Sequence, residues 1–143
     1  MQLNHWQNFP LDIPLVRKGE QVVTRGQFLS HVRLAASSLP DGQHVINLCD
    51  DRYLFMVTFF AALLRNKINL LPPNRASDTI VETMRNYPDS FCVSDVAYPN
   101  LTVPVHKISW LDFQTTAGMQ EVGQCREQLP TTAGMQEVKA LAG

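Results

Sequence analysis

The sequence predicts an α/β domain in which a mostly parallel sheet lies between helices on both of its faces, giving three layers. The stretch His44–Pro73 has the pattern of strand, acidic turn, apolar helix and strand, which is a βαβ unit. A further helix and strand follow it, and helical crossovers between strands favour parallel pairing. With 143 residues, 45% of them hydrophobic and 17% charged, the chain has the size and composition of one folded domain.

A β-hairpin and a helix are predicted before this unit. Leu15–Thr24 contains two short apolar runs around Gly19, which can take the positive φ of a tight turn. Thr24 and Gln27 have the spacing of a capping box, in which each side chain accepts a hydrogen bond from the backbone N–H of the other residue. Apolar residues then recur at helical spacing, so a helix is expected to run from Thr24 to about Leu39.

The core of the predicted sheet begins at His44–Cys49, a short and mostly apolar strand that ends at two aspartates. Asp51 is suited to cap the next helix. That helix, Leu54–Leu64, is apolar except at Thr58, so it must be covered on nearly all sides. The following strand, Ile68–Leu71, stops at two prolines, which cannot continue a hydrogen-bonded ladder.

Another helix and two more strands complete the prediction. Ser77 is suited to cap a helix that ends before Pro88. Ser90–Ser94 is a third apolar strand. Thr102–Ile108 is a fourth, which we place near a sheet edge because Pro104 within it has no N–H to donate.

The last part of the chain has a different character. The sequence TTAGMQEV occurs at residues 115–122 and again, unchanged, at residues 131–138. Two identical copies favour a recent duplication or an artificially introduced copy over a structural repeat, because structural repeats vary at surface positions and need several copies to bury a core. We therefore predict a domain over residues 1–112 and a helical or disordered tail over residues 113–143.

Charge, hydropathy and cysteine content argue against several classes of partner. The net charge of −1, without a cluster of Lys and Arg, favours neither nucleic acid nor a membrane surface. The apolar helix is about 16 Å long, too short for a hydrocarbon core of roughly 30 Å. The N-terminus lacks the basic start and apolar stretch of a signal peptide. Cys49, Cys92 and Cys125 lie far apart, so we expect buried, reduced thiols in a cytoplasmic protein.

Polar residues follow the predicted strands at the point where each strand ends. Ligands of open α/β sheets bind outside the carboxyl ends of the strands, so these residues are the candidates for a ligand site. They are Asp50, Asp51, Arg52, Asn74, Arg75 and Asp95. The alternative is that each caps a helix or closes a turn. No metal site is predicted, because the histidines are scattered, and the sequence has no glycine-rich phosphate loop.

Taken together, the residues from Leu15 to Asp95 resemble the opening of the adenylate-forming (AMP-binding) ligase superfamily, which includes acyl-CoA and aryl-CoA synthetases. Its members commonly begin with a hairpin, a Thr-initiated helix, a strand, a polar turn, an apolar helix and a strand that ends in Pro. Thr24, Asp51 and Pro72 match that Thr, that turn and that Pro, whereas Lys67 stands where the superfamily usually has Gly. The resemblance implies a partial domain from the N-terminal region of such a ligase.

The resemblance also implies a chemistry. In that superfamily a carboxylate attacks the α-phosphate of ATP to give an acyl-adenylate, and a thiol of CoA or of a carrier protein then displaces AMP. The residues that carry these steps lie in later motifs, which this sequence does not contain. No catalytic residue and no cofactor are therefore assigned to this chain, ATP and Mg²⁺ are expected only for a complete ligase, and whether the chain is itself an enzyme stays open.

A second resemblance is to the receiver domain of response regulators. Asp50 and Asp51 resemble its paired acids, which hold Mg²⁺, and Asp95 resembles its phosphorylated aspartate. Such a carboxylate cluster would bind a hard cation. Against this alternative, about forty residues precede the acid pair, where a receiver begins almost at once, and Lys107 arrives too early to be the lysine that ends a receiver's final strand.

A third hypothesis is a stand-alone interaction or dimerisation module. A truncated sheet leaves an exposed edge and an apolar face, and both favour association. The expected partners are accordingly the remainder of a ligase, another chain that supplies it, or a second copy of this chain. Neither nucleic acid nor a membrane is expected.

Overall fold

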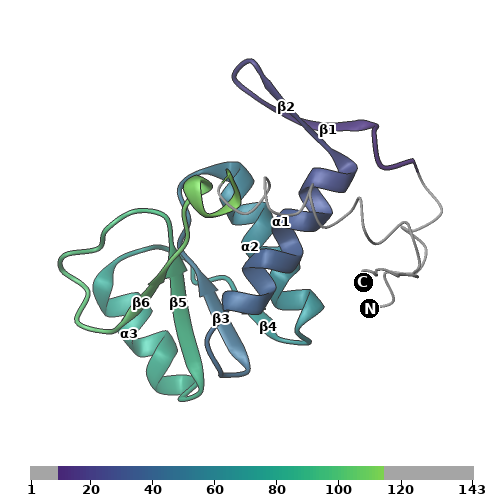
Figure 1. Ribbon diagram of the computed structural model, residues 1–143. Helices are drawn as coiled ribbons and strands as arrows, with labels where there is room; N and C mark the ends of the chain where they lie inside the picture. The colour runs from purple at the N-terminus through teal and green to yellow at the C-terminus, as the bar shows by residue number, and fades with distance from the viewer. Residues whose placement is uncertain (1–9, 115–143) are drawn as a thin grey trace, which may run out of the picture. The chain divides into compact units, whose positions relative to one another are not determined.

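The computed structural model describes residues 10–114, and the chain divides into two compact units after Ser109. The fold is that of the first unit, shown in Figure 1. Of the second unit the structure describes a helical segment in which the rings of Trp110 and Phe113 pack edge to face, with centroids 6.3 Å apart. Cys125 and both copies of TTAGMQEV lie outside the described residues, so the prediction of a helical or disordered tail stays a prediction.

The predicted hairpin is present. Strands β1 (Pro14–Lys18) and β2 (Gln21–Thr24) pair in antiparallel fashion. Gly19 takes a φ of 64° in the turn between them, as its lack of a side chain permits. Figure 1 shows this hairpin standing beyond the N-terminal end of helix α1, apart from the main sheet.

Helix α1 (Arg25–Ser38) begins at the predicted capping box. The Thr24 hydroxyl accepts a hydrogen bond from the Gln27 backbone N–H at 3.2 Å, and the Gln27 side chain accepts one from the Thr24 N–H at 2.9 Å. Two N–H groups that would otherwise lack partners in the first turn are thereby bonded. The helix ends at Ser38 with Leu39 as its C-cap, close to the end that the sequence predicts.

The main sheet has four parallel strands in the order β4-β3-β5-β6. These strands are β3 (His44–Asn47), β4 (Ile68–Leu70), β5 (Ser90–Ser94) and β6 (Val105–Lys107). The prediction of a mostly parallel sheet is therefore confirmed. Strand β6, which follows Pro104, lies at one edge of the sheet as expected, although it is shorter than the predicted Thr102–Ile108.

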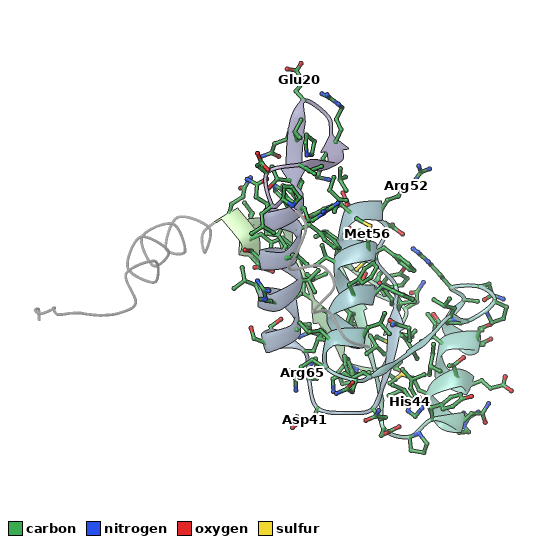
Figure 2. The ribbon with its side chains drawn as sticks, turned by 90° about the vertical axis from the view of Figure 1, so that its right-hand side faces the viewer. Glu20, Asp41, His44, Arg52, Met56 and Arg65 are labelled. Carbon is green, nitrogen blue, oxygen red and sulfur yellow. The ribbon has the colours of Figure 1, made fainter. Side chains whose placement is uncertain are left out.

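Helices cover both faces of this sheet, which confirms the three-layer prediction. Helices α1 and α2 (Arg52–Leu64) lie on one side and α3 (Ser77–Asn86) on the other, as Figure 2 shows. On the α3 side, Ile46, Leu48, Ile80 and Cys92 form a buried apolar cluster. Successive residues of a strand point to opposite faces, so neighbouring strand residues supply the core on the α2 side.

One helix prediction, the N-cap of α3, needs correction. The N-cap of α3 is Ala76, which makes no side-chain capping bond, and Ser77 is the first helical residue. The Asn74 side chain accepts a hydrogen bond from the Ala76 N–H at 2.8 Å, which forms a turn just before the helix. Helix α2 carries its fully buried residues along one side. Its outer residues Phe55, Met56, Phe59 and Leu63 are partly buried.

The turn from α2 into β4 explains how the chain accommodates Lys67. Asn66 takes a φ of 57°, the left-handed conformation that Asn tolerates best among residues with a side chain. Its N–H donates to the Leu63 carbonyl at 3.0 Å, and the Lys67 N–H donates to the Ala62 carbonyl at 2.8 Å. This is a Schellman motif, which places the positive φ at Asn66, so Lys67 needs no positive φ as it leads into β4.

No helix among residues 10–114 has both the length and the apolar character needed to cross a membrane.

Candidate functional site

The predicted site residues lie at the carboxyl edge of the parallel sheet, after three neighbouring strands. Asp50, Asp51 and Arg52 follow β3, Asn74 and Arg75 follow β4, and Asp95 follows β5. Strand order explains why residues so far apart in sequence meet, because β3 lies between β4 and β5. Hydrogen bonds join four of them, Asp50, Asp51, Arg75 and Asp95, in one network.

Asp95 joins the end of β5 to the turn that follows β3. One carboxylate oxygen accepts a hydrogen bond from the Asp50 N–H at 2.7 Å, and the other accepts one from the Asp51 N–H at 3.0 Å. A carboxylate that accepts from two backbone amides just before a helix N-terminus is stabilised by those donors and by the helix dipole. Both oxygens of Asp95 are therefore engaged in holding the turn.

Asp51 caps helix α2, as the sequence predicts. One oxygen accepts hydrogen bonds from the Tyr53 N–H at 2.8 Å and the Leu54 N–H at 3.0 Å. The other forms an ion pair with Lys18 of the hairpin. Burial alone would raise the pKa of Asp51, but the bonds from Lys18 and from the backbone outweigh it and lower that pKa. The carboxylate is thus kept ionised as a cap that also ties the hairpin to the sheet.

Arg75 crosses from the end of β4 to the end of β3. Its guanidinium pairs with the Asp50 carboxylate and donates to the Cys49 carbonyl at 2.9 Å and to the Tyr98 hydroxyl at 3.4 Å. Burial tends to lower the pKa of Arg75, and its bonds to Tyr98 and Asp50 outweigh this and raise it. Because the side chain is 42% exposed, the ion pair itself adds little stability.

The two remaining candidates do not join this network. Arg52 is exposed at the start of α2, and Figure 2 shows its side chain extending away from the helix. Asn74 is exposed and bonds its own chain two residues ahead, as an Asx turn does. For Asn74 the alternative that it closes a turn is therefore the observed one.

Three residues that form hydrogen bonds or ion pairs at this edge were not predicted from the sequence. Lys18 pairs with Asp51, Tyr98 donates to the Leu48 carbonyl at 3.2 Å, and the buried Ser94 hydroxyl donates to the Val96 carbonyl at 2.9 Å. No local sequence pattern identifies Lys18, because its partner Asp51 caps helix α2, which is far from the hairpin in sequence. Ser94 could have been found, since a Ser that ends a buried strand commonly bonds nearby backbone.

The carboxylates at this edge do not form a metal cluster within residues 10–114. No group of three or more His, Cys, Asp or Glu there could hold a metal ion. The three carboxylates that resemble a receiver site are bonded separately, to Arg75, to Lys18 and the α2 backbone, and to the turn. Burial raises the pKa of the Cys49 thiol to about 11, so it is a protonated, unreactive group.

Comparison with solved structures gives the fold its context. The chain is similar to the Klebsiella oxytoca NpsA N-terminal subdomain in complex with 3-hydroxybenzoyl-AMSN, with a TM-score of 0.57 and 17% identity over 76% of this chain and 29% of that one. It is also similar to O-succinylbenzoate coenzyme A synthetase (MenE) from Bacillus subtilis in complex with AMP, with a TM-score of 0.59 and 16% identity over 79% of this chain and 32% of that one.

The chain has the fold found in the N-terminal subdomain of adenylate-forming ligases. This confirms the fold that the sequence resemblance implied, while identities of 16–17% establish the fold alone. The chain matches no more than 32% of the length of these two structures. No protein-family model matches the chain, and no curated protein matches its sequence. What the neighbours bind therefore remains a property of those proteins.

Proposed function

We propose that this chain is the N-terminal scaffold of an ATP-dependent adenylate-forming ligase that activates an acyl or aryl carboxylate, and that it is catalytically incomplete alone. The observation that carries the proposal is the asymmetry of the structural match. Up to 79% of this chain superimposes on the MenE structure but corresponds to only 32% of it. The part of a ligase that lies outside this match would supply the remaining groups.

The chemistry at the carboxyl edge supports a scaffold role. Adenylation requires a carboxylate oxygen to attack the α-phosphorus of ATP while pyrophosphate leaves, and the following transfer requires a thiol to attack the acyl carbon while AMP leaves. Both steps need groups that can bind phosphate or stabilise developing charge. In this chain the side chains of Asp51, Arg75 and Asp95 are already bonded, to Lys18, to the Cys49 carbonyl and to the Asp51 N–H respectively. Their role is to fix the turns on which a site is built.

ATP and Mg²⁺ are then cofactors of the complete ligase. Its partner would be the remaining part of the enzyme, in the same polypeptide or in a second one. The carboxylate and the thiol acceptor would be selected by that part, because this sequence contains none of the superfamily's later motifs.

Calorimetric titration with ATP and Mg²⁺ tests the incompleteness of the chain. We expect no binding heat beyond dilution, and no carboxylate-dependent exchange of pyrophosphate into ATP. Saturable nucleotide binding or measurable exchange by the isolated chain would contradict it. An Arg75→Gln variant provides the control, since any genuine nucleotide binding at the carboxyl edge should weaken when that guanidinium is removed.

Sequencing the coding region beyond Gly143, and the reading frames beside it, tests the ligase assignment itself. We expect a Ser/Thr/Gly-rich loop that ends in Pro-Lys, either in frame or in a neighbouring gene. A region in which neither location encodes such a loop would contradict the assignment and leave the fold without its ligase.

A further inference from the structure

The two edges of the main sheet differ in how they meet solvent. The β6 edge carries Lys107 and is preceded by Pro104, and both residue types discourage pairing with another strand. The β4 edge carries apolar side chains instead. Ile68 is 50% exposed, Leu71 is 64% exposed and Leu64, at the end of α2, is 36% exposed. An uncharged, apolar strand at a sheet edge is a template for pairing.

We propose that this β4 edge, defined by Leu64, Ile68, Asn69 and Leu71, binds the same edge of a second copy of this chain. The two β4 strands would run antiparallel around a two-fold axis at Asn69, so that the two parallel sheets become one continuous sheet. This inference does not depend on the proposed ligase function.

The backbone of β4 sets the register of this contact. The Ile68 N–H donates to the Gln43 carbonyl at 2.8 Å, so Ile68 directs its backbone groups toward β3. Alternate residues of a strand direct their N–H and C=O to opposite sides, which turns those of Asn69 to the open edge. Two copies related by a two-fold axis there can exchange both bonds between their Asn69 residues, as in a hydrogen-bonded antiparallel pair.

The charges around β4 favour a second copy as the occupant. None of the residues that define the edge is charged, so the same patch on another copy meets no like charge. The flanking cations are directed elsewhere. Arg65 donates to the Ala36 carbonyl of α1 at 2.6 Å, and Lys67 is buried, donating to the Gly42 carbonyl. Pairing of β6 with its own copy would instead bring two Lys107 residues together.

The sequence also limits the strength of the contact. Pro72 and Pro73 follow Leu71 directly, so the ladder cannot extend beyond it. The Asn69 side chain points inward, since its amide donates to the Phe59 carbonyl at 3.2 Å and its Oδ1 is buried. The stabilisation therefore comes from the Asn69 backbone and from Ile68, Leu71 and Leu64. We expect a reversible dimer that forms with increasing concentration.

Sedimentation velocity of the full chain over a range of concentrations tests this contact, and Asn69→Pro with Asn69→Ala is the matched pair. Asn69→Pro removes the N–H that points away from β3 but leaves the bond from the Ile68 N–H to the Gln43 carbonyl. We therefore expect the Asn69→Pro variant to remain monomeric. Asn69→Ala removes the bond to Phe59 but keeps the N–H, so we expect it to dimerise as the wild type does. Far-UV circular dichroism establishes that each variant is folded.

A second pair keeps the test decisive if Asn69→Pro does not fold. Ile68→Lys places a charge on the edge and should shift the dimer dissociation constant upward by at least about tenfold. Asn86→Lys adds the same charge at the exposed end of α3 and should leave it unchanged. A wild-type chain that stays monomeric up to its solubility limit overturns the proposal. So does a dimer that persists in folded Ile68→Lys, since its contact then lies elsewhere.

Discussion

Asp89 and Asp95 lie just before and just after β5, and each carboxylate reaches across to the chain beside β3. At the carboxyl end, Asp95 accepts hydrogen bonds from the backbone N–H groups of Asp50 and Asp51. At the amino end, Asp89 accepts bonds from the Gln43 N–H at 3.2 Å and from the His44 ring at 2.7 Å. Two aspartates thus join the same two strands at opposite ends, with different partners.

The different partners of the two aspartates indicate which end of β5 is held more firmly to β3. Both partners of Asp95 are backbone amides, which do not titrate, and they orient the turn that starts α2. Asp89 is 51% exposed and relies partly on a histidine, whose ring also stacks near Tyr87 with centroids 4.8 Å apart. Water and salt weaken an exposed pair far more than a partly buried one. The carboxyl end should therefore be the stronger of the two connections.

The largest effect is expected for Gly42→Ala, at the amino end. Gly42 has a φ of 123°, and a Cβ there would lie 2.5 Å from the Asp89 carbonyl oxygen. Backbone strain and this clash should lower the free energy of unfolding by on the order of 3 kcal/mol. Gly19→Ala is the matched control, because Gly19 also has a positive φ, but a Cβ added there would meet no atom within 4 Å. Urea unfolding measures both; equal losses would show that the close approach to Asp89 contributes nothing.

Removal of the carboxyl-end connection should rank second. Asp95→Ala leaves the Asp50 and Asp51 N–H groups without their acceptor, which should cost about 1–3 kcal/mol of the free energy of unfolding. Asp89→Ala should cost less, because that carboxylate is exposed and the Gln43 N–H also bonds the Asp89 backbone carbonyl at 3.1 Å. Chemical denaturation of the two variants compares the ends directly, and a larger loss for Asp89→Ala would reverse the ranking.

Mild acid should destabilise the protein through His31, which is buried between α1 and α2 and hydrogen-bonded to the Tyr53 hydroxyl at 2.7 Å. Burial lowers the pKa of His31 below 6.5, so the unfolded chain binds protons more readily. Its contribution is present above pH 6.5 and is lost as the pH falls through the lower folded pKa. His31→Gln should reduce the difference in unfolding free energy between about pH 7.5 and about pH 5.5. If the difference in unfolding free energy were the same in His31→Gln and the wild type, groups other than His31 would cause the loss of stability in acid.

The smallest expected effect is the loss of stability in strong acid that comes from Asp89, at the amino end of β5. The His44 hydrogen bond lowers the pKa of Asp89 below 3.8, so its contribution is present above pH 3.8 and is lost as the pH falls through the folded pKa. Asp89→Asn should flatten the pH dependence of unfolding in that window relative to the wild type. NMR titration of the Asp89 carboxyl carbon measures the same shift, and a midpoint at or above 3.8 would contradict it.

Sequence alone predicted the features that depend on neighbouring residues. The turn at Gly19, the capping box of Thr24 and Gln27 and the cap at Asp51 are all local, and each was found where expected. The predicted cap of α3 was wrong because Ser77 lies one residue inside the helix, and the N-cap position is held by Ala76, which has no side chain to accept a bond.

Features that depend on strand order could not be predicted in the same way. Asp95 was expected at the carboxyl edge, but its bonds to the Asp50 and Asp51 amides follow from β5 lying beside β3. The ion pair of Lys18 with Asp51 joins the hairpin to α2 over 33 positions of sequence. Such contacts depend on how distant elements pack, which local patterns do not encode.

The proposed function implies that the carboxyl edge of the isolated chain is scaffold bonded to itself and binds no nucleotide alone. The most direct test follows the backbone amide resonances of Asp50, Asp51 and Asp95 by NMR during titration with ATP and Mg²⁺. We expect that these resonances do not move and that the Asp50 and Asp51 amides stay protected from hydrogen exchange by their bonds to Asp95. A saturable shift confined to these amides would contradict the scaffold role.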